Sequence, residues 1–359
     1  MQNKTVVVGM SGGVDSSVAA YLLKEQGYNV IGVTMQIWQK DDVSAVEDNG
    51  GCCGLTAVDD ARRVCDRLGI PHYVMNFRDI FKHEVIDDFI SEYVSGRTPN
   101  PCIRCNRYVK WEALLKRSLE IGADYIATGH YARISKLDNG RFAIVKSITD
   151  KKDQTYALYN LTQEQLSRTL FPVGEFEKDE IRRIAEEIGL AVAHKKDSQD
   201  ICFVPDDDYG RFMRDEGVEL PPPGDFVDKE GNKLGEHKGI HQYTIGQRKG
   251  LGIAFGTPIY VCDINTDNNQ VVLGSNDDIF SSSLLCKDLN HMGVERFPED
   301  KEIFTKIRYG SKGEYCKITY LGKDLCRCDF VKPVRAITPG QAVVFYDGDV
   351  VLGGGIITR

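Results

Sequence analysis

The sequence has 359 residues, of which 42% are hydrophobic and 27% are charged, with 35 glycines. This length and composition are typical of a globular protein with two or three domains and exclude a disordered or fibrous chain. The net charge of −8 gives no overall basic character, so a nucleic-acid partner would need local basic patches.

Membrane insertion and a disulfide framework are not expected. The chain contains no apolar run of the ~18 residues that a membrane span needs, and residues 1–4 lead directly into a predicted strand. We therefore expect a cytoplasmic protein with no membrane partner. Eleven cysteines in such a chain indicate reduced thiols that serve catalysis or metal binding.

The first predicted strand, Val6–Val8, is joined to a helix from Ser16 by a glycine-rich turn. Gly12 and Gly13 leave no Cβ in the way and tolerate positive φ, so backbone N–H groups can point into one concavity. The hydroxyl of Ser11 and the positive end of the helix also suit a phosphate. The turn predicts an anion site at the carboxyl end of the strand, where open α/β sheets bind ligands.

This turn is not the P-loop of ordinary NTPases, because no lysine follows Gly13 and Asp15 stands in that region. A carboxylate repels a polyphosphate unless a cation intervenes, so Asp15 predicts a bound Mg²⁺. The hexapeptide Ser11–Ser16 resembles the PP-loop of the ATP pyrophosphatases. These enzymes cleave ATP between its α and β phosphates and adenylate an oxygen of the second substrate.

Strands and helices then alternate, which predicts a Rossmann-like parallel sheet covered on both faces. The predicted strands are Asn29–Trp38 and Pro71–Phe77, and the predicted helices are Thr56–Gly69 and Phe81–Val94. Met35 lies near the carboxyl end of its strand, where it could support an adenine ring or belong to the core.

The segment Gly96–Arg107 carries Cys102 and Cys105. Its two prolines predict a constrained loop that leads into a helix over Tyr108–Ile121. A thiol near a helix N-terminus with Arg104 beside it should have a lowered pKa and be nucleophilic. The Cys-x-x-Cys spacing also suits redox chemistry or metal binding, and the sequence leaves these alternatives open.

Three further residues belong with this chemistry. A predicted strand over residues 123–128 ends at Gly129, which allows close approach of a nucleotide, and at His130, which could face the second substrate or make a structural hydrogen bond. Cys202 is flanked by apolar residues and preceded by two lysines. By itself it would be a small buried hydrophobe, whereas together with Cys105 it suggests a pair that exchanges sulfur.

The residue pattern changes at Pro221–Gly224. Beyond it, hairpin signals and short alternating strands predict an all-β region that ends in a barrel. Cys326 and Cys328 fit simple strand alternation there. We predict an α/β PP-loop domain with a Rossmann-like parallel sheet, a small central mostly-β domain and a C-terminal β-barrel. The predicted ranges are 1–215, 216–282 and 283–359.

The chain resembles the tRNA-specific 2-thiouridylases over essentially its whole length. The resemblance rests on the PP-loop, Asn-Pro-Cys-x-x-Cys-Asn, Thr-Gly-His-Tyr-Ala-Arg, Lys-Lys-Asp-Gln and Lys-Lys-Asp-Ser…Ile-Cys-Phe, which occur in that order. It implies conversion of the wobble uridine of tRNA to 2-thiouridine, with ATP and a sulfur atom from an upstream persulfide donor protein. It also implies that the basic C-terminal barrel contacts tRNA.

The resemblance assigns residues to each step. It implies ATP contacts at Gly9, Met10, Ser11, Gly12, Gly13, Val14, Asp15, Ser16, Met35 and Gly129. It implies contacts to tRNA and its target base at Asn100, Pro101, Cys102, His130, Lys152, Asp153, Gln154, Arg308, Tyr309 and Gln341. ATP would adenylate the C2 oxygen of a flipped-out uridine, persulfide sulfur on Cys202 would attack C2, and Cys105 would release the product by disulfide formation.

Three alternatives stay open at this stage. Many family members have Asp where this chain has Cys102, and a thiol is a weaker substitute for the general acid/base role assigned to that Asp. Cys102, Cys105 and Cys202 could therefore hold an iron-sulfur cluster and give the same product. A PP-loop ligase that delivers nitrogen and a non-catalytic nucleotide sensor are the other two alternatives.

Overall fold

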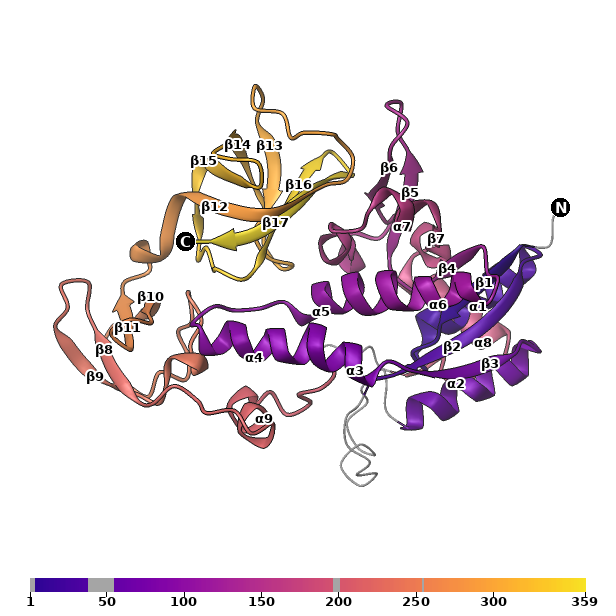
Figure 1. The fold of residues 1–359 in the computed structure, drawn as a ribbon, viewed down its shortest axis with the longest axis horizontal. Coiled ribbons are helices and arrows are strands. Elements are labelled where there is room, and N and C mark those ends of the chain that lie inside the picture. Colours follow the sequence, from indigo (N-terminus) through magenta and orange to yellow (C-terminus); the bar gives the residue numbers. More distant parts are fainter. Residues whose placement is uncertain (1–3, 38–54, 196–200, 254) are drawn as a thin grey trace.

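The computed structural model describes residues 4–37, 55–195, 201–253 and 255–359, and it contains three β-sheets. Figure 1 shows the N-terminal sheet at one end of an elongated molecule and the barrel and central domain at the other. Helices α4 and α5 run between them. Across the described ranges, no helix has the length and apolar character needed to cross a membrane.

The N-terminal domain is built on a parallel five-stranded sheet with the order β3-β2-β1-β4-β7, which confirms the predicted Rossmann-like fold. Its strands are β1 Thr5–Gly9, β2 Asn29–Gln36, β3 His72–Asn76, β4 Tyr125–Ala127 and β7 Thr169–Leu170. The predicted end of the second strand, Trp38, lies outside the described residues.

Both faces of this sheet are covered, as the apolar run of β1 requires. Val7 packs into one hydrophobic cluster with the helices between residues 78 and 120, whereas Val6 and Val8 pack into a second cluster with α1, α2 and α8. The helical segments are α1 Val14–Glu25, α2 Leu55–Leu68, α3 Arg78–Phe81, η2 Lys82–Ile86, α4 Asp87–Val94, α5 Pro101–Arg104, η3 Cys105–Leu114, α6 Leu115–Glu120, η4 Asp150–Lys152, η5 Thr155–Leu158, α7 Gln163–Ser167, η6 Pro172–Glu175, α8 Lys178–Glu187 and α9 Tyr209–Asp215.

The prediction that Cys102 and Cys105 lie on a loop is wrong. The helix begins at Pro101 and continues through η3 and α6, so both cysteines lie in its first turns. Proline is well tolerated at the first helical position because its missing N–H would be unpaired there anyway. Asn100 caps this end, since its side-chain oxygen accepts a hydrogen bond from the Ile103 N–H at 3.3 Å.

The central domain has a four-stranded sheet with the order β10-β11-β8-β9 and a hydrophobic cluster of its own around Phe226 and Val261. This confirms the predicted small β domain. Its elements are β8 Gly224–Val227, β9 Lys233–His237, η7 Ile240–Gln242, β10 Tyr260–Asn265, β11 Gln270–Gly274 and η8 Asp277–Ile279.

The C-terminal strands form an antiparallel barrel that is closed by pairing of β12 with β17, as predicted. They are β12 Phe280–His291, β13 Ile303–Lys306, β14 Glu314–Tyr320, β15 Leu325–Arg335, β16 Ala342–Asp347 and β17 Val350–Thr358. The hairpin β5 Ala132–Lys136 and β6 Phe142–Lys146 joins the same sheet through the pair Val145 and Val350. A hairpin of the N-terminal domain thus connects it to the barrel.

Candidate active site

The PP-loop between β1 and α1 depends on one glycine more than on the others. Gly12 has φ +66°, and a Cβ at this position would stand 2.4 Å from the carbonyl oxygen of Ala57. Gly13 caps α1 with φ −107°, and its nearest neighbour would be the Ser11 hydroxyl at 3.4 Å. Positive φ is therefore required at Gly12 and not at Gly13, although the sequence allowed it at both.

A second close approach comes from Gly129, which follows β4. A Cβ there would stand 2.6 Å from the backbone nitrogen of Ser16, so the turn after β4 lies directly against the start of α1. The side chains of Met10 and Val14 are buried in the core, so any contact of these residues with a nucleotide would come from their backbone. Met35 is half-buried at the carboxyl end of β2, paired with Met75 of β3.

The serine hydroxyls of the loop already have partners within it. The Ser16 hydroxyl contacts the Ser11 hydroxyl at 3.1 Å and donates to the Gly13 carbonyl at 3.2 Å, and the Ser17 hydroxyl donates to the same carbonyl at 2.7 Å. Serines in a first helical turn often bond backward in this way. Phosphate binding would then rest on the backbone N–H groups and the helix end.

Asp15 is held by two residues that the sequence did not assign to the site. The Lys178 ammonium donates to both oxygens of Asp15 at 2.7 and 2.8 Å, and the Tyr131 hydroxyl donates to one of them at 2.7 Å. Lys195 donates to the Gly12 carbonyl at 3.1 Å. Tyr131 belongs to the motif that contains Gly129, whereas Lys178 lies 163 residues from Asp15 and has no local signal.

Cys102 and Cys105 lie three residues apart on one helix, which places them on the same helical face. Cys102 is exposed and Cys105 is half-buried. Between them, Arg104 donates to the Glu84 carbonyl at 2.9 Å and forms an ion pair with the Glu84 carboxylate at 3.1 Å. The Arg104 charge thus has a carboxylate partner on the neighbouring helix, which offsets its effect on the thiols.

Cys202 borders the same hydrophobic cluster as Cys105. Its neighbour Phe203 packs edge-on against Phe81 and Phe89, with ring centroids 5.7 and 5.2 Å apart. Glu84, the partner of Arg104, lies on the same helical stretch between these two phenylalanines. One helix therefore contacts the immediate neighbours of both predicted sulfur-carrying residues.

His130 is packed between aromatic rings. Its ring centroid lies 5.6 Å from that of Trp111 and 6.0 Å from that of Phe171, and its Nδ1 lies 2.6 Å from the Thr128 hydroxyl. Burial, with a smaller effect of Lys110, lowers the pKa of His130 well below its ordinary value. The imidazole is therefore neutral at pH 7.

The predicted tRNA residues of the N-terminal domain meet those of the barrel at one junction. Gln154 accepts a hydrogen bond from the Tyr131 N–H at 2.8 Å, which ties its segment to the turn after β4. Tyr309 packs against Tyr156 with centroids 6.4 Å apart. Burial is the main cause that raises the pKa of Asp153, and Lys306 of the barrel opposes it. Lys152 and Arg308 are both half-buried beside these residues.

Gln341 joins the barrel to the loop before the helix that carries Cys102 and Cys105. We call this helix, which comprises α5, η3 and α6, the cysteine helix. Its side-chain amide donates to the carbonyls of Thr98 and Pro99 at 3.0 and 2.9 Å. The Thr98 N–H donates to the Pro339 carbonyl at 2.9 Å, and the Thr98 hydroxyl contacts that of Thr244 in the central domain at 3.0 Å. All three domains therefore meet one residue before the Pro-Asn-Pro-Cys sequence.

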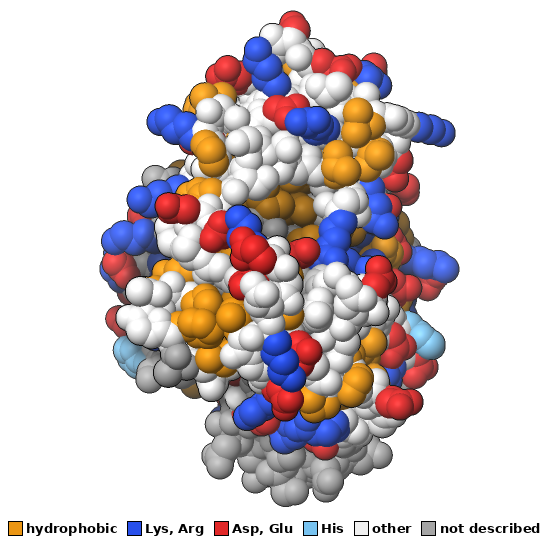
Figure 2. All heavy atoms as spheres, turned by 90° about the vertical axis from the view of Figure 1, so that its left-hand side faces the viewer, with side chains coloured by type: hydrophobic (Ala, Val, Ile, Leu, Met, Phe, Trp, Pro, Cys, Tyr) orange, Lys and Arg blue, Asp and Glu red, His pale blue; other side chains and the backbone are white. Residues whose placement is uncertain are grey.

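The side of the molecule that carries the central domain and barrel has mixed charge. Figure 2 shows lysine and arginine side chains interspersed with acidic ones on this face, with no single-sign field. This fits the net charge of −8 and indicates that binding of a polyanion depends on local groups such as those at the junction.

Sequence profiles of three domains match the chain in order. They are the tRNA methyl transferase HUP domain over residues 4–206, the tRNA methyl transferase PRC-barrel domain over residues 212–275 and the aminomethyltransferase β-barrel domain over residues 281–357. The first profile alone covers more than half of the chain.

Similar proteins match from end to end. The tRNA-specific 2-thiouridylase MnmA of Lachnoclostridium phytofermentans is 64% identical over 99% of this chain and 100% of its own length. That of Clostridioides difficile is 57% identical over 99% of both chains. Among solved structures, a 4-thiouridine synthetase–RNA complex with bound ATP is similar with a TM-score of 0.38 and 21% identity, over 56% of this chain and 46% of that chain.

Proposed function

Because this chain belongs to the tRNA-specific 2-thiouridylase family, we propose that it replaces O2 of the wobble uridine of tRNA with sulfur, in a reaction that consumes ATP. Family membership makes it a tRNA sulfurtransferase with a PP-loop. It also removes the nitrogen ligase and the nucleotide sensor that the sequence had left open. A cytoplasmic location follows from this proposal, since the substrate is tRNA.

The PP-loop would serve the first step. Oxide is a poor leaving group, so ATP adenylates O2 of the uridine, and pyrophosphate leaves. The N–H groups of the loop and the start of α1 would bind the phosphates. The Asp15 carboxylate fits a Mg²⁺ ion that takes its other ligands from phosphates and water, which is the usual protein site for this ion. The Lys178 ammonium, now on Asp15, would then face the phosphates as well.

The two cysteines would serve the second step. The terminal sulfur of a Cys202 persulfide attacks C2, and AMP leaves with the former O2. The Cys105 thiolate then attacks the Cys202 sulfur, which forms a Cys105–Cys202 disulfide and releases 2-thiouridine. An external dithiol reduces the disulfide, and an upstream donor protein restores the persulfide.

The observation that carries this proposal is the shared helix beneath both cysteines. Glu84 contacts the residue beside Cys105, and Phe81 and Phe89 contact the residue beside Cys202. The exposed Cys102 lies on the same face as Cys105, and in this proposal its thiol exchanges a proton with the target base.

The test is nucleoside mass spectrometry of unmodified tRNA after incubation with the full chain, ATP, Mg²⁺ and glutathione persulfide. We expect 2-thiouridine from the wild type and from Cys262→Ser, a matched control in the central domain. Cys202→Ser and Cys105→Ser should lose product at least about 100-fold. Full product from either variant would overturn the persulfide route.

Metal analysis separates this route from the cluster alternative. The persulfide route predicts full activity in protein that contains no iron or acid-labile sulfide. If activity instead follows the iron content, and if Cys102→Ser loses iron and activity together, the three cysteines hold a cluster and the persulfide route is wrong.

A further inference from the structure

Four cysteines meet inside the C-terminal barrel, in a hydrophobic cluster separate from the one that Cys105 and Cys202 border. Cys286 lies on β12, Cys316 on β14, and Cys326 and Cys328 on β15. All four are fully buried and point into the barrel. Strand alternation explains why Cys326 and Cys328 share a face, but it does not explain why neighbouring interior positions on three strands all carry a thiol.

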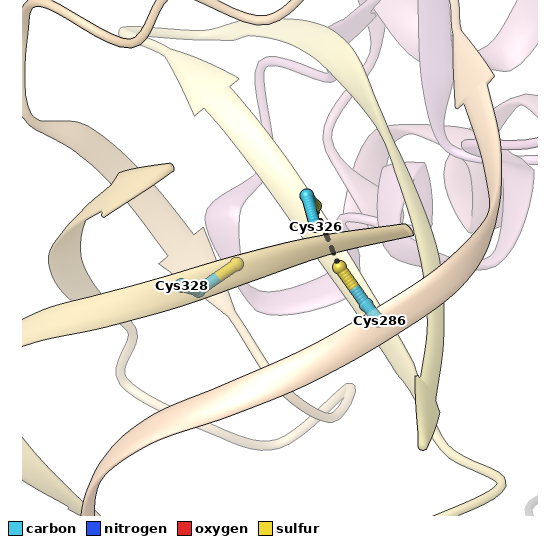
Figure 3. A group of neighbouring side chains, drawn as sticks. All are labelled: Cys286, Cys326 and Cys328. Atoms are coloured by element: carbon cyan, nitrogen blue, oxygen red, sulfur yellow. Dashed lines mark hydrogen bonds between the residues drawn. The ribbon is translucent and has the colours of Figure 1, made fainter. Parts of the chain in front are cut away.

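The thiols form one compact group. Cys286 and Cys326 are direct partners across the β12–β15 ladder, and their Sγ atoms lie 3.1 Å apart (Figure 3). The Sγ atoms of Cys286, Cys326 and Cys328 all lie within 4.8 Å of one another. Cys316 lies inside the barrel beside this trio, because its Sγ is 3.2 Å from the Thr305 hydroxyl and Ile318, two residues further along β14, pairs with Cys328. Cys316 can therefore complete a set of four ligands.

These separations suit a single metal ion. Zinc binds four thiolates at about 2.3 Å in a tetrahedron, which places the sulfur atoms about 3.8 Å apart. The Sγ separations among Cys286, Cys326 and Cys328, which include 3.1 Å and do not exceed 4.8 Å, bracket this value. An iron-sulfur cluster attaches its thiolates to different iron atoms, so it needs wider spacing than this core provides. Soft sulfur ligands without carboxylates also disfavour Mg²⁺ and Ca²⁺.

We propose that Cys286, Cys316, Cys326 and Cys328 bind one structural zinc ion inside the barrel. Each thiol loses its proton as the metal binds, so the site forms as a zinc tetrathiolate with two net negative charges. Positive charge is available nearby, because Arg141 donates to the His291 carbonyl of β12 at 2.6 Å and Arg296 stacks on Tyr320, the β14 partner of Cys326, 3.6 Å from the ring centroid. The ion would fasten β12, β14 and β15 to one another.

This site is separate from the sulfur-transfer chemistry, so the two can be tested apart. The full chain, purified with zinc in the growth medium, should contain about one zinc ion per chain by mass spectrometry of the metal. Cys328→Ser should lower the zinc content at least about tenfold. Cys262→Ser, and a variant with serine at positions 102, 105 and 202, should both keep the full zinc content.

Two further measurements distinguish loss of the metal site from misfolding of the variant. Cobalt added to the zinc-free full chain should give the thiolate-to-cobalt charge-transfer absorption of a tetrahedral sulfur site, and Cys328→Ser should not. A chelator should lower the melting temperature of the wild type by several degrees and leave that of Cys328→Val unchanged.

Two results would overturn the proposal. If the protein contains no metal after purification, does not bind cobalt and yields all barrel thiols to a thiol reagent once unfolded, the cysteines only fill the core. If the intact mass is short of two hydrogens and peptide mapping joins Cys286 to Cys326, the pair forms a disulfide and the zinc site does not exist.

Discussion

The PP-loop and the three-domain junction at Thr98 are built in opposite ways. The loop is one continuous segment whose shape is fixed by steric contact, with Gly12 against Ala57 and Gly129 against Ser16. The junction is assembled by hydrogen bonds between distant residues, since Gln341 lies 243 residues from Thr98. ATP chemistry is thus encoded locally, whereas presentation of the cysteine helix to tRNA depends on the assembled fold.

This difference predicts how each region fails. Steric contacts between backbone atoms cannot relax by moving a side chain, so a methyl group added at Gly12 or Gly129 should be severe. Hydrogen bonds at the junction each contribute about 1 kcal/mol net, so their loss should shift geometry and rate without unfolding the protein.

The sharpest test of the loop compares two adjacent glycines. Gly12→Ala would adopt φ +66° at a cost of about 1–2 kcal/mol and would collide with Ala57, which adds at least as much again. We expect loss of ATP binding and a melting temperature lower by about 5 °C or more. Gly13→Ala should change both by little, because its Cβ has room. Isothermal titration with ATP and thermal unfolding measure the pair; equal effects at the two positions would contradict the steric account.

Substitution of Lys178 tests whether ATP chemistry at the PP-loop depends on a residue that is distant in the sequence. Lys178→Ala removes the ammonium that contacts both Asp15 oxygens and leaves that carboxylate facing the phosphates. We expect kcat/KM for ATP to fall about 100-fold, which corresponds to about 3 kcal/mol. The control is Arg183→Ala on the same helix, an exposed residue paired with Glu187, which should stay within about twofold. If Lys178→Ala leaves kcat/KM for ATP unchanged, the loop needs no partner that is distant in the sequence.

Gln341→Ala tests the junction. It removes the two hydrogen bonds to the Thr98 and Pro99 carbonyls and frees the loop before the cysteine helix. We expect kcat for thiolation of tRNA to fall about tenfold while the Kd for ATP is unchanged. Thr319→Ala, at an exposed position of β14, is the matched barrel control. A parallel loss of ATP affinity would mean that the two regions are coupled.

The same contrast explains what the sequence could predict. The parallel sheet, the PP-loop and the closed barrel follow from local patterns, because each is specified by neighbouring residues. The sequence pattern misplaces the start of the cysteine helix, because proline usually breaks a helix, whereas Pro101 occupies the first helical position. Lys178 was not found because its contact with Asp15 exists only after α8 packs beside α1. The four barrel cysteines were likewise brought together by strand register alone.

His130 follows Gly129 of the nucleotide site and packs against Trp111 of the cysteine helix. We expect its substitution to have the smallest effect of those considered. Because burial lowers its folded-state pKa, the folded protein binds fewer protons than the unfolded chain as the pH falls below about 6.5. Its contribution to stability is therefore fully present above that pH and is lost as the pH falls.

We expect the wild type to lose about 1 kcal/mol more than His130→Gln between about pH 7 and pH 5.5, measured by denaturant unfolding at each pH. His83→Gln is the control, because the His83 side chain is 78% exposed and should leave the pH dependence of the wild type unchanged. If His130→Gln keeps the slope of the wild type, the His130 imidazole gains its proton in the folded protein over the same pH range as in the unfolded chain. The aromatic packing between the nucleotide loop and the cysteine helix would then tolerate a charge, and the two regions would be separated by a more polar boundary than the contacts of Trp111 and Phe171 indicate.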